Sequence, residues 1–441
     1  MQIQLPEHVK YILKTFRDAG YEAYAVGGCV RDSILGKEPK DWDITTNATP
    51  TETKALFART IDTGIVHGTV TILLDHTGYE VTTYRVDGEY EDGRHPKQVS
   101  FTASLAEDLR RRDFTINAMA YSDEEGLVDL FGGINDLEQG IIRCVGMATE
   151  RFTEDALRMM RAIRFSAQLG FELEAETMQA IRTLAHSIRK ISAERIQMEL
   201  IKTLVSDHPQ HMRLLYELGL SAYFLPEFDR MMETGQVNPH HCYSVGEHTI
   251  HALSQVLPDK VLRLTMLLHD VAKPACKTSD EAGIDHFHGH PKLGAEMAKQ
   301  ILRRLKLDND TIRRVSSLIL WHDDNPPLTA RAVRRAVVRV GIEQFPDLFA
   351  VKRADVLAQS DYKRDEKLLY IDDYERIYQE IRRQQQCLCI RDLAVDGKDL
   401  MEAGITQGKE IGETLKRLLE LVLEEPEKNT KEYLLSQIKE S

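Results

Sequence analysis

The sequence lacks long hydrophobic runs and a regular cysteine framework. In its 441 residues, no apolar stretch approaches the roughly 20 residues that a membrane helix needs. The start of the chain, MQIQLPEHVKYILKTF, lacks the basic segment and following apolar segment of a signal peptide. Its six cysteines are scattered, so we expect free thiols in a cytoplasmic protein rather than a disulfide scaffold.

The sequence also lacks an excess of positive charge. Lysine and arginine number 57 against 70 aspartates and glutamates, which gives a formal net charge of −13. This balance argues against non-specific attraction to nucleic acid, although it permits a local basic surface. The composition, 42% hydrophobic and 29% charged, is that of a globular protein, and the length predicts several domains.

Residues 24–46, YAVGGCVRDSILGKEPKDWDITT, place a glycine turn next to two carboxylates. We predict a strand that ends at the turn, a helix carrying Arg31, and a second strand carrying Asp41 and Asp43. Residues two apart on a strand face the same side, and paired carboxylates suit Mg²⁺. Backbone amides at Gly28 and the Arg31 guanidinium suit phosphate. The stretch therefore predicts a metal–triphosphate site for nucleotidyl transfer.

The periodicity of the chain changes after about residue 138. Residues 64–74 and 79–85 alternate as paired strands do, whereas 154–169, 174–188 and 193–205 have helical spacing. We therefore predict an α/β head with a small mixed sheet and helices, followed by an all-α body and a helical tail.

Two further stretches of the head carry candidate site residues. Glu80, in YEVTTYR, is a candidate third acidic group beside Asp41 and Asp43. In RRDFTINA, both arginines could reach a triphosphate, while the carboxylate and the amide could hydrogen-bond a ribose. The residues of this second stretch are Arg111, Arg112, Asp113 and Asn117.

The segment EDALR contains Glu154, Asp155 and Arg158. On one helix these side chains would be neighbours, and the simplest interpretation is a surface ion pair. The alternative is base selection, because an aspartate accepts from an exocyclic amine while an arginine donates to a ring nitrogen or carbonyl. Cytosine and adenine match such a pair, whereas uracil and guanine leave a carbonyl against the carboxylate. Arg161 and Arg164 follow as nucleotide-binding candidates, and we predict that helix 191–200 supports this segment.

The ordered set GGCVRDSILGKEPKDWDI, RRDFTINA, DLFGG, EDALRMMRAIRF and SAERI resembles class II tRNA nucleotidyltransferases, the CCA-adding family of the polymerase-β superfamily. The resemblance covers about residues 1–230. It implies Mg²⁺ at Asp41 and Asp43, with the tRNA 3′ end, CTP and ATP as substrates. It also implies that Asp155 and Arg158 replace a template, and that the loop 86–104 helps the pocket to switch between bases.

The same resemblance leaves related activities to be compared. Bacterial poly(A) polymerases usually have a more basic counterpart of GIVHGTVTI and lack the adjacent Glu–Asp pair of EDALR, so the chain follows the tRNA-enzyme pattern. CC-adding enzymes usually have a shortened flexible loop, whereas EYEDGRHPKQVSF is complete here. An enzyme that adds only the terminal AMP to tRNA ending in CC stays open as the alternative.

A second constellation of histidines and aspartates lies in the body. Such ligands suit Mn²⁺, Ni²⁺, Zn²⁺ or Fe²⁺, and the pattern resembles an HD-domain metal-dependent phosphohydrolase. An HD phosphohydrolase with an RNA-binding head is therefore the alternative from a different class. The candidate ligands are His248, His269, Asp270, His290, His322 and Asp355.

These patterns predict a division of the chain into segments with different roles. Residues 1–138 form the nucleotidyltransferase head, and 139–240 form a helical neck for nucleotide selection and RNA binding. Residues 241–360 form the HD metal-binding domain, and 361–441 form a helical tail that is a tRNA-binding candidate.

Overall fold

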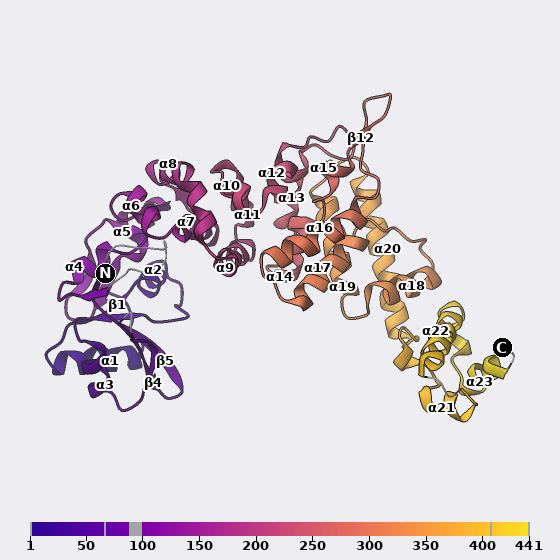
Figure 1. Cartoon of the computed structure of the whole chain (residues 1–441), viewed down its shortest axis with the longest axis horizontal. Coiled ribbons are helices and arrows are strands. Elements are labelled where there is room, and N and C mark those ends of the chain that lie inside the picture. Colours follow the sequence, from indigo (N-terminus) through magenta and orange to yellow (C-terminus); the bar gives the residue numbers. More distant parts are fainter. Residues whose placement is uncertain (1, 66–67, 88–98, 406–407, 440–441) are drawn as a thin grey trace. The chain divides into compact units, whose positions relative to one another are not determined.

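The structure, a computed structural model, describes residues 2–65, 68–87, 99–405 and 408–439. The chain divides into two compact units, Met1–Pro226 and Glu227–Ser441. The first contains the mixed sheet and the second is mainly helical (Figure 1), which confirms the predicted fold class. None of the helices in the described ranges is both long and apolar enough to cross a membrane.

The first unit is built on a seven-stranded sheet with the order β3-β4-β5-β2-β1-β8-β9. Its inner strands β1 and β2 are antiparallel, whereas β2 and β5 are parallel, so the sheet is mixed as predicted. The strands are β1 Ala23–Val26, β2 Ile44–Thr46, β3 Thr60–Gly64, β4 Thr69–Leu74, β5 Thr77–Thr83, β8 Met119–Ser122 and β9 Gly126–Asp129. Short ladders pair β6 Arg85–Asp87 with β7 Val99–Phe101, and β10 Ile141–Ile142 with β11 Glu172–Leu173.

The helices of this unit begin with α1, whose apolar spacing is confirmed by four buried side chains, Val9, Ile12, Leu13 and Phe16. Helix α3 packs on α1 and on β4 (Figure 1). Thr49 caps α3, because its hydroxyl and Glu52 form a capping box. The helices are α1 Glu7–Asp18, α2 Gly28–Ile34, α3 Pro50–Leu56, α4 Leu105–Arg110, α5 Gly133–Gln139, α6 Ala148–Glu154, α7 Leu157–Leu169, α8 Ala175–Leu184, α9 Ala193–Leu204, α10 Arg213–Glu217 and α11 Ser221–Phe224.

The predicted loop 86–104 is only partly described, because residues 88–98 lie outside the described ranges. Its two ends form the β6–β7 ladder, so part of this stretch is strand rather than loop. The ladder leads directly into α4, and Leu109 of α4 packs with Tyr24, Val26 and Tyr84 in one apolar cluster. This packing places α4 against the central strands.

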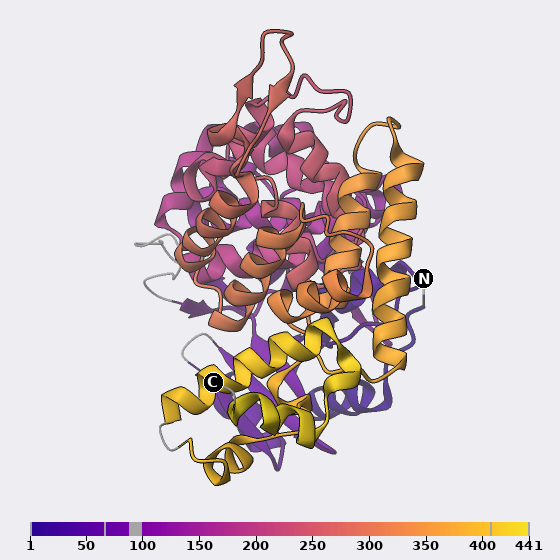
Figure 2. The same cartoon turned by 90° about the vertical axis from the view of Figure 1, so that its right-hand side faces the viewer.

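In the second unit, α14 packs on α17 and α19, and α16 packs on α17. A hairpin of β12 Thr278–Ser279 and β13 Asp285–His286 extends from these helices in both views (Figures 1 and 2). The C-terminal helices, yellow in Figure 2, enclose a separate apolar cluster that includes Leu400, Leu418 and Val422. The helices are α12 Pro226–Glu233, α13 Val245–Leu253, α14 Lys260–Leu268, α15 Lys273–Cys276, α16 His290–Arg304, α17 Asn309–Trp321, α18 Ala330–Val340, α19 Phe345–Leu357, α20 Arg364–Arg383, α21 Gly397–Glu402, α22 Gly408–Glu424 and α23 Lys431–Lys439.

Candidate active site and metal cluster

The glycine turn and the two predicted metal aspartates meet at the end of β1. The Val26 amide donates to the Asp43 carbonyl over 2.9 Å, and the chain then turns at Gly27, whose φ is +82°. Strand β2 begins only at Ile44, so the prediction that Asp41 and Asp43 lie on a strand is wrong. The physical reason is that β1 ends at the turn, which leaves the residues before Asp43 without a strand partner on that side.

Glu80 lies beside Asp43, as the sequence led us to expect. Strand β5 pairs in parallel with β2, with Val81 opposite Ile44, so the preceding residues Glu80 and Asp43 are also neighbours. The pKa of the Asp43 carboxyl is raised because surrounding protein displaces water from it and because Glu80 and Asp41 add negative charge, while Arg112 opposes the rise. A group of carboxylates that repel one another fits a hard divalent cation such as Mg²⁺.

The predicted phosphate and ribose groups form one network. Arg31, only 8% exposed, donates from Nη1 to Asn117 Oδ1 over 2.7 Å. Asn117 Nδ2 donates to Asp113 Oδ1 over 3.4 Å, and Arg161 Nε donates to Asp113 Oδ2 over 2.7 Å. Burial would raise the pKa of Asp113, but Arg161 and Arg158 outweigh it and lower that pKa to about 2. The carboxylate therefore stays ionised and acts as an acceptor.

Three arginines surround one aromatic ring in this network. The guanidinium carbons of Arg31, Arg161 and Arg164 lie 5.2, 5.4 and 3.9 Å from the centroid of the Phe165 ring. Cation–π attraction and the planar contact hold such side chains in place. Arg164 also donates to Glu199 of α9 over 2.5 Å in a buried ion pair, so it connects the arginine network to α9.

The EDALR segment differs from its predicted form. Helix α6 ends at Glu154 and α7 begins at Leu157, with Asp155 in extended conformation between them. The prediction of one continuous helix is wrong because the Asp155 carboxylate accepts from the Leu157 amide over 2.9 Å and so caps α7. Arg158 still meets Glu154, with Nη1 2.6 Å from Oε2.

The predicted support from helix 191–200 is present. Arg195 of α9 donates from Nη2 to Asp155 Oδ2 over 2.7 Å. Arg158 donates from Nη2 to the Arg111 carbonyl over 3.1 Å. Both candidate base-selecting side chains are thus held by partners outside their own segment, which orients them before a base arrives.

One buried acid of the head was absent from the sequence-based candidates. Asp108 in α4 is 0% exposed and pairs with Arg111 and Arg112. Its only signal in the sequence is its spacing, three and four residues before two arginines, which is the spacing of helical ion pairs.

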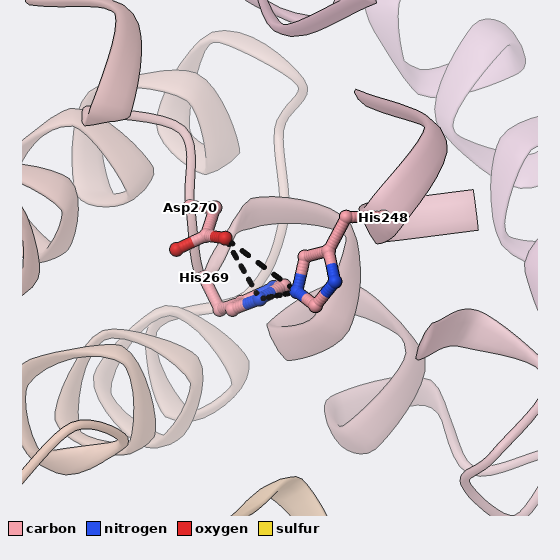
Figure 3. Close-up of side chains that lie close together, drawn as sticks. All are labelled: His248, His269 and Asp270. Atoms are coloured by element: carbon pink, nitrogen blue, oxygen red, sulfur yellow. Dashed lines mark hydrogen bonds and ion pairs between the residues drawn. The ribbon is translucent and has the colours of Figure 1, made fainter. Parts of the chain in front are cut away.

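The second constellation comes together in the helical unit. His248 Nε2 lies 3.2 Å from His269 Nε2 and 2.9 Å from Asp355 Oδ1. His248 and His269 approach Asp270 Oδ2 at 3.6 and 3.3 Å (Figure 3). His290 approaches the other oxygen, Oδ1, at 3.4 Å.

The remaining predicted ligand, His322, lies on the same side as His290. Its Nε2 is 3.3 Å from His290 Nε2 and 3.9 Å from Asp270 Oδ1. The structure therefore brings every predicted member of the cluster together, with histidines on both sides of the Asp270 carboxylate.

The Nδ1 atoms of these four histidines, which face away from the centre of the cluster, lie within hydrogen-bond distance of backbone carbonyls. The Nδ1 atoms of His248, His269, His290 and His322 lie 3.2, 2.8, 2.9 and 2.6 Å from backbone carbonyl oxygens. A carbonyl only accepts, so each Nδ1 carries a proton and each ring turns its Nε2 inward. Two pairs of Nε2 atoms therefore lie only 3.2–3.3 Å apart, and such converging imidazole nitrogens suit the ligation of a shared cation.

The carboxylates of the cluster are equally suited to a cation. Asp270 is 1% exposed, and within the described ranges neither of its oxygens has a hydrogen-bond partner, although Lys273 Nζ lies 2.8 Å from Oδ2 as an ion pair. Burial would raise the pKa of Asp270, but His269 and Lys273 lower it well below its usual range. A buried and ionised carboxylate among imidazoles fits a divalent transition metal.

The cluster opens into a cavity of about 640 Å³. Besides cluster residues, the cavity is lined by Lys273, Lys352, Lys363 and Lys367. Buried Lys352 donates to the His322 carbonyl over 2.8 Å and thereby fixes the end of α17. Positive charge beside a metal cluster suits a phosphate-bearing ligand.

Family models match most of the chain. The "Poly A polymerase head domain" matches residues 23–143, an RNA- and SrmB-binding site of polymerase A matches 170–232, and the tRNA nucleotidyltransferase domain 2 matches 278–438. The first match contains the glycine turn, Asp41, Asp43 and RRDFTINA.

Curated relatives and solved structures agree with these matches. The CCA-adding enzyme of Levilactobacillus brevis is 38% identical over 432 residues, which are 94% of each chain. That of Lactiplantibacillus plantarum is 56% identical over 209 residues, or 47% of this chain and about half, 51%, of the relative. The crystal structure of the Bacillus stearothermophilus CCA-adding enzyme in complex with CTP is 30% identical, covers 99% of this chain and 98% of that one, and has a TM-score of 0.76. The chain belongs to the CCA-adding enzymes, the tRNA nucleotidyltransferase family.

Proposed function

We propose that this chain adds CMP and AMP to the 3′ end of tRNA from CTP and ATP, without a nucleic-acid template. The observation that carries the proposal is the meeting of Asp43, Glu80 and Arg112 beside the glycine turn. The primer 3′-oxygen forms a bond to the α-phosphorus, the bond to the pyrophosphate breaks, and the primer proton leaves to solvent. The matched relatives are CCA-adding enzymes, which favours full addition over addition of the terminal AMP alone.

The side chains divide this reaction between them. Arg31, Arg111 and Arg112 would hold the triphosphate, and Asp113 and Asn117 the ribose. Asp41, Asp43 and Glu80 would hold Mg²⁺, which supplies charge neutralisation and activation of the primer hydroxyl when bound. Because Asn117 and Asp113 are already bonded to Arg31 and Arg161, the phosphate and sugar contacts belong to one preorganised network.

Base choice would depend on Asp155 and Arg158. The carboxylate accepts from the amine of cytosine or adenine, and the guanidinium donates to the ring. Their partners Arg195 and Glu154 keep both side chains oriented, so the protein surface takes the place of a template. We place the reaction in the cytoplasm, where tRNA and nucleoside triphosphates are available.

The test is labelling of tRNA transcripts that lack the whole CCA, lack only the terminal A, or are complete. Full CCA addition predicts labelling of the shortest transcript by α-labelled CTP, whereas an A-adding enzyme labels only the transcript ending in CC, with ATP. Asp41→Ala should abolish labelling, and Asp75→Asn, in the exposed β4–β5 turn, should retain it. Absence of labelling in the unmodified protein would refute the transferase.

We also propose that the helical unit binds a divalent transition metal and hydrolyses phosphoesters. The supporting observation is the set of inward-facing histidine Nε2 atoms around the buried Asp270 carboxylate. His248, His269, Asp270, His290, His322 and Asp355 would hold the metal, which supplies an activated water when bound. The lysines of the cavity would bind the phosphate.

Metal content and hydrolysis test this second activity separately. Protein loaded with Mn²⁺, Ni²⁺, Zn²⁺ or Fe²⁺ is compared with His269→Ala and His322→Gln, using a nucleoside 2′,3′-cyclic phosphate and a 2′-phosphate as substrates. His251→Ala is the matched control, because it removes a histidine from α13 that lies outside the cluster. Metal retention and unchanged hydrolysis in both cluster variants would exclude the site.

A further inference from the structure

Asp108 is a buried carboxylate at the junction of several parts of the head. Its Oδ1 receives Arg111 Nη2 and Nε at 2.6 and 3.0 Å. Its Oδ2 receives Arg112 Nη2 at 3.3 Å and the Thr45 hydroxyl at 3.2 Å. The Arg85 amide lies 3.4 Å from Oδ1. These contacts join α4, β2, the β6 entry to the loop, and both candidate phosphate-binding arginines.

The cost of burying this charge indicates that its partners matter. An isolated carboxylate without exposure loses all of its hydration. Burial raises the pKa of Asp108, but the guanidiniums of Arg111 and Arg112 outweigh burial and lower the pKa below its usual value. Asp108 is therefore ionised at neutral pH, and the two arginines are fixed by charge-assisted hydrogen bonds that divide between its two oxygens.

Of the two arginines that Asp108 holds, Arg112 lies near the glycine turn and Asp43. Arg112 Nη1 would lie 3.1 Å from a Cβ at Gly27, so this guanidinium covers the glycine turn. Arg112 also lowers the pKa of Asp43. Its Nε is buried and has no hydrogen-bond partner within the described ranges.

A second connection leads from Asp108 to base selection. Thr45, which binds Asp108, lies two residues after the metal aspartate Asp43 on the same chain segment. Arg111, which Asp108 fixes through its side chain, accepts Arg158 Nη2 at its backbone carbonyl over 3.1 Å. Asp108 thus lies between the groups proposed to hold metal, triphosphate and base.

We propose that Asp108 is a positioning residue for nucleotidyl transfer, which holds Arg111 and Arg112 in the orientation that receives the nucleoside triphosphate. The inference rests on the proposed transferase function of the head. Asp108 itself touches neither triphosphate nor primer, and it acts through the two arginines. Glu107, the other carboxylate of α4, is exposed and accepts from the Thr102 hydroxyl instead.

The decisive variant is Asp108→Asn, which keeps the shape of the side chain and removes its charge. The NH₂ group of the amide then points a donor at a guanidinium, where the carboxylate oxygen accepted a hydrogen bond. We expect the KM for CTP and ATP to rise about tenfold or more, because hydrogen bonds to charged groups are lost, while the KM for tRNA stays within about twofold. Glu107→Gln is the matched control, because it neutralises an exposed acid next to Asp108 in α4.

A cycle of variants separates positioning from a purely structural role. Affinity for CTP, measured by calorimetry, should fall in Asp108→Asn and in Arg112→Met. The double variant Asp108→Asn with Arg112→Met should bind CTP no more weakly than the double variant Arg111→Met with Arg112→Met. Thr45→Val removes one contact to Oδ2 without altering the carboxylate, and it should raise the KM for triphosphates by roughly two- to fivefold. This milder variant gives an answer if Asp108→Asn does not fold.

The outcomes are distinguishable. An active unmodified enzyme whose triphosphate KM is unchanged in both Asp108→Asn and Thr45→Val overturns the inference. Equal losses for tRNA and triphosphate, together with a lower melting temperature, would also overturn it, because they indicate a structural role alone. An unmodified enzyme that labels no tRNA would instead refute the proposed function on which the inference rests.

Discussion

Replacing Asp155 by asparagine should weaken the discrimination of CTP from UTP. In the structure, Asp155 Oδ1 accepts from the Leu157 amide over 2.9 Å and Oδ2 accepts from Arg195 over 2.7 Å. Asparagine can keep the contact that caps α7, but it presents an NH₂ group where the carboxylate had an acceptor. In the proposed base-selecting pocket, this NH₂ group would present a donor to Arg195 and to the Watson–Crick edge of the base, which matches the carbonyl of uracil and opposes the amine of cytosine.

The magnitude follows from the number of unmatched groups. In the proposed pocket of the unmodified enzyme, UTP would set one carbonyl against one partly buried carboxylate, an unpaired contact that would cost about 1–3 kcal/mol. This cost corresponds to a discrimination of roughly 5- to 150-fold in kcat/KM. Asp155→Asn should remove most of this preference and reduce kcat/KM for CTP by a similar factor.

The assay is single-turnover addition to tRNA that lacks CCA, with CTP and UTP in separate reactions. The matched control is Arg195→Met, which leaves the carboxylate in place and removes only the guanidinium that orients it. It should lower kcat/KM for CTP while the carboxylate still rejects UTP. A CTP-to-UTP ratio that is unchanged in Asp155→Asn would refute base selection by this residue, and the surface ion-pair interpretation would then be preferred.

Further predictions concern stability and metal binding. Glu199→Ala should lower the free energy of unfolding, measured with urea, by about 3–5 kcal/mol, because it leaves Arg164 buried without its counter-charge. The double variant Arg164→Met with Glu199→Leu should leave this free energy nearly unchanged. Equal losses in the two variants would contradict this account. The pKa of Asp113 is about 2 in the folded protein, against a usual value of 3.8. Its ionised carboxylate should therefore add about 2 kcal/mol to the free energy of unfolding above pH 4, and this contribution is lost as the pH falls toward 2. The difference in unfolding free energy between the unmodified chain and Asp113→Asn should therefore be smaller at pH 3 than at pH 6, and a constant difference would exclude the ion pair as its source. Chelation should lower the melting temperature of the helical unit if the Asp270 cluster is loaded, and Asp270→Asn should remove this dependence.

Local patterns identified helices where burial and periodicity agree. The helical spacing of 193–205 is found as α9, Ala193–Leu204, and that of 174–188 begins with α8, Ala175–Leu184. The pattern failed at EDALR, where apolar spacing continues across a break in the backbone. Whether Asp155 continues a helix or caps the next one depends on competing hydrogen bonds to its own backbone neighbours, which residue spacing does not reveal.

The sequence by itself determined the order of the motifs and the chemistry that each can perform. Asp41 and Asp43 beside a glycine turn, RRDFTINA, and the ordered histidines and aspartates of the body all predicted their kinds of ligand, because metal and phosphate binding depend on side-chain type. Only the tertiary structure decided which groups meet. The pairing of β2 with β5 brought Glu80 to Asp43, α9 supplied Arg195 to Asp155, and Thr45 and Arg85 completed the surroundings of Asp108. These contacts join residues far apart in the chain, and they form only when strand pairing and helix packing have determined which surfaces touch.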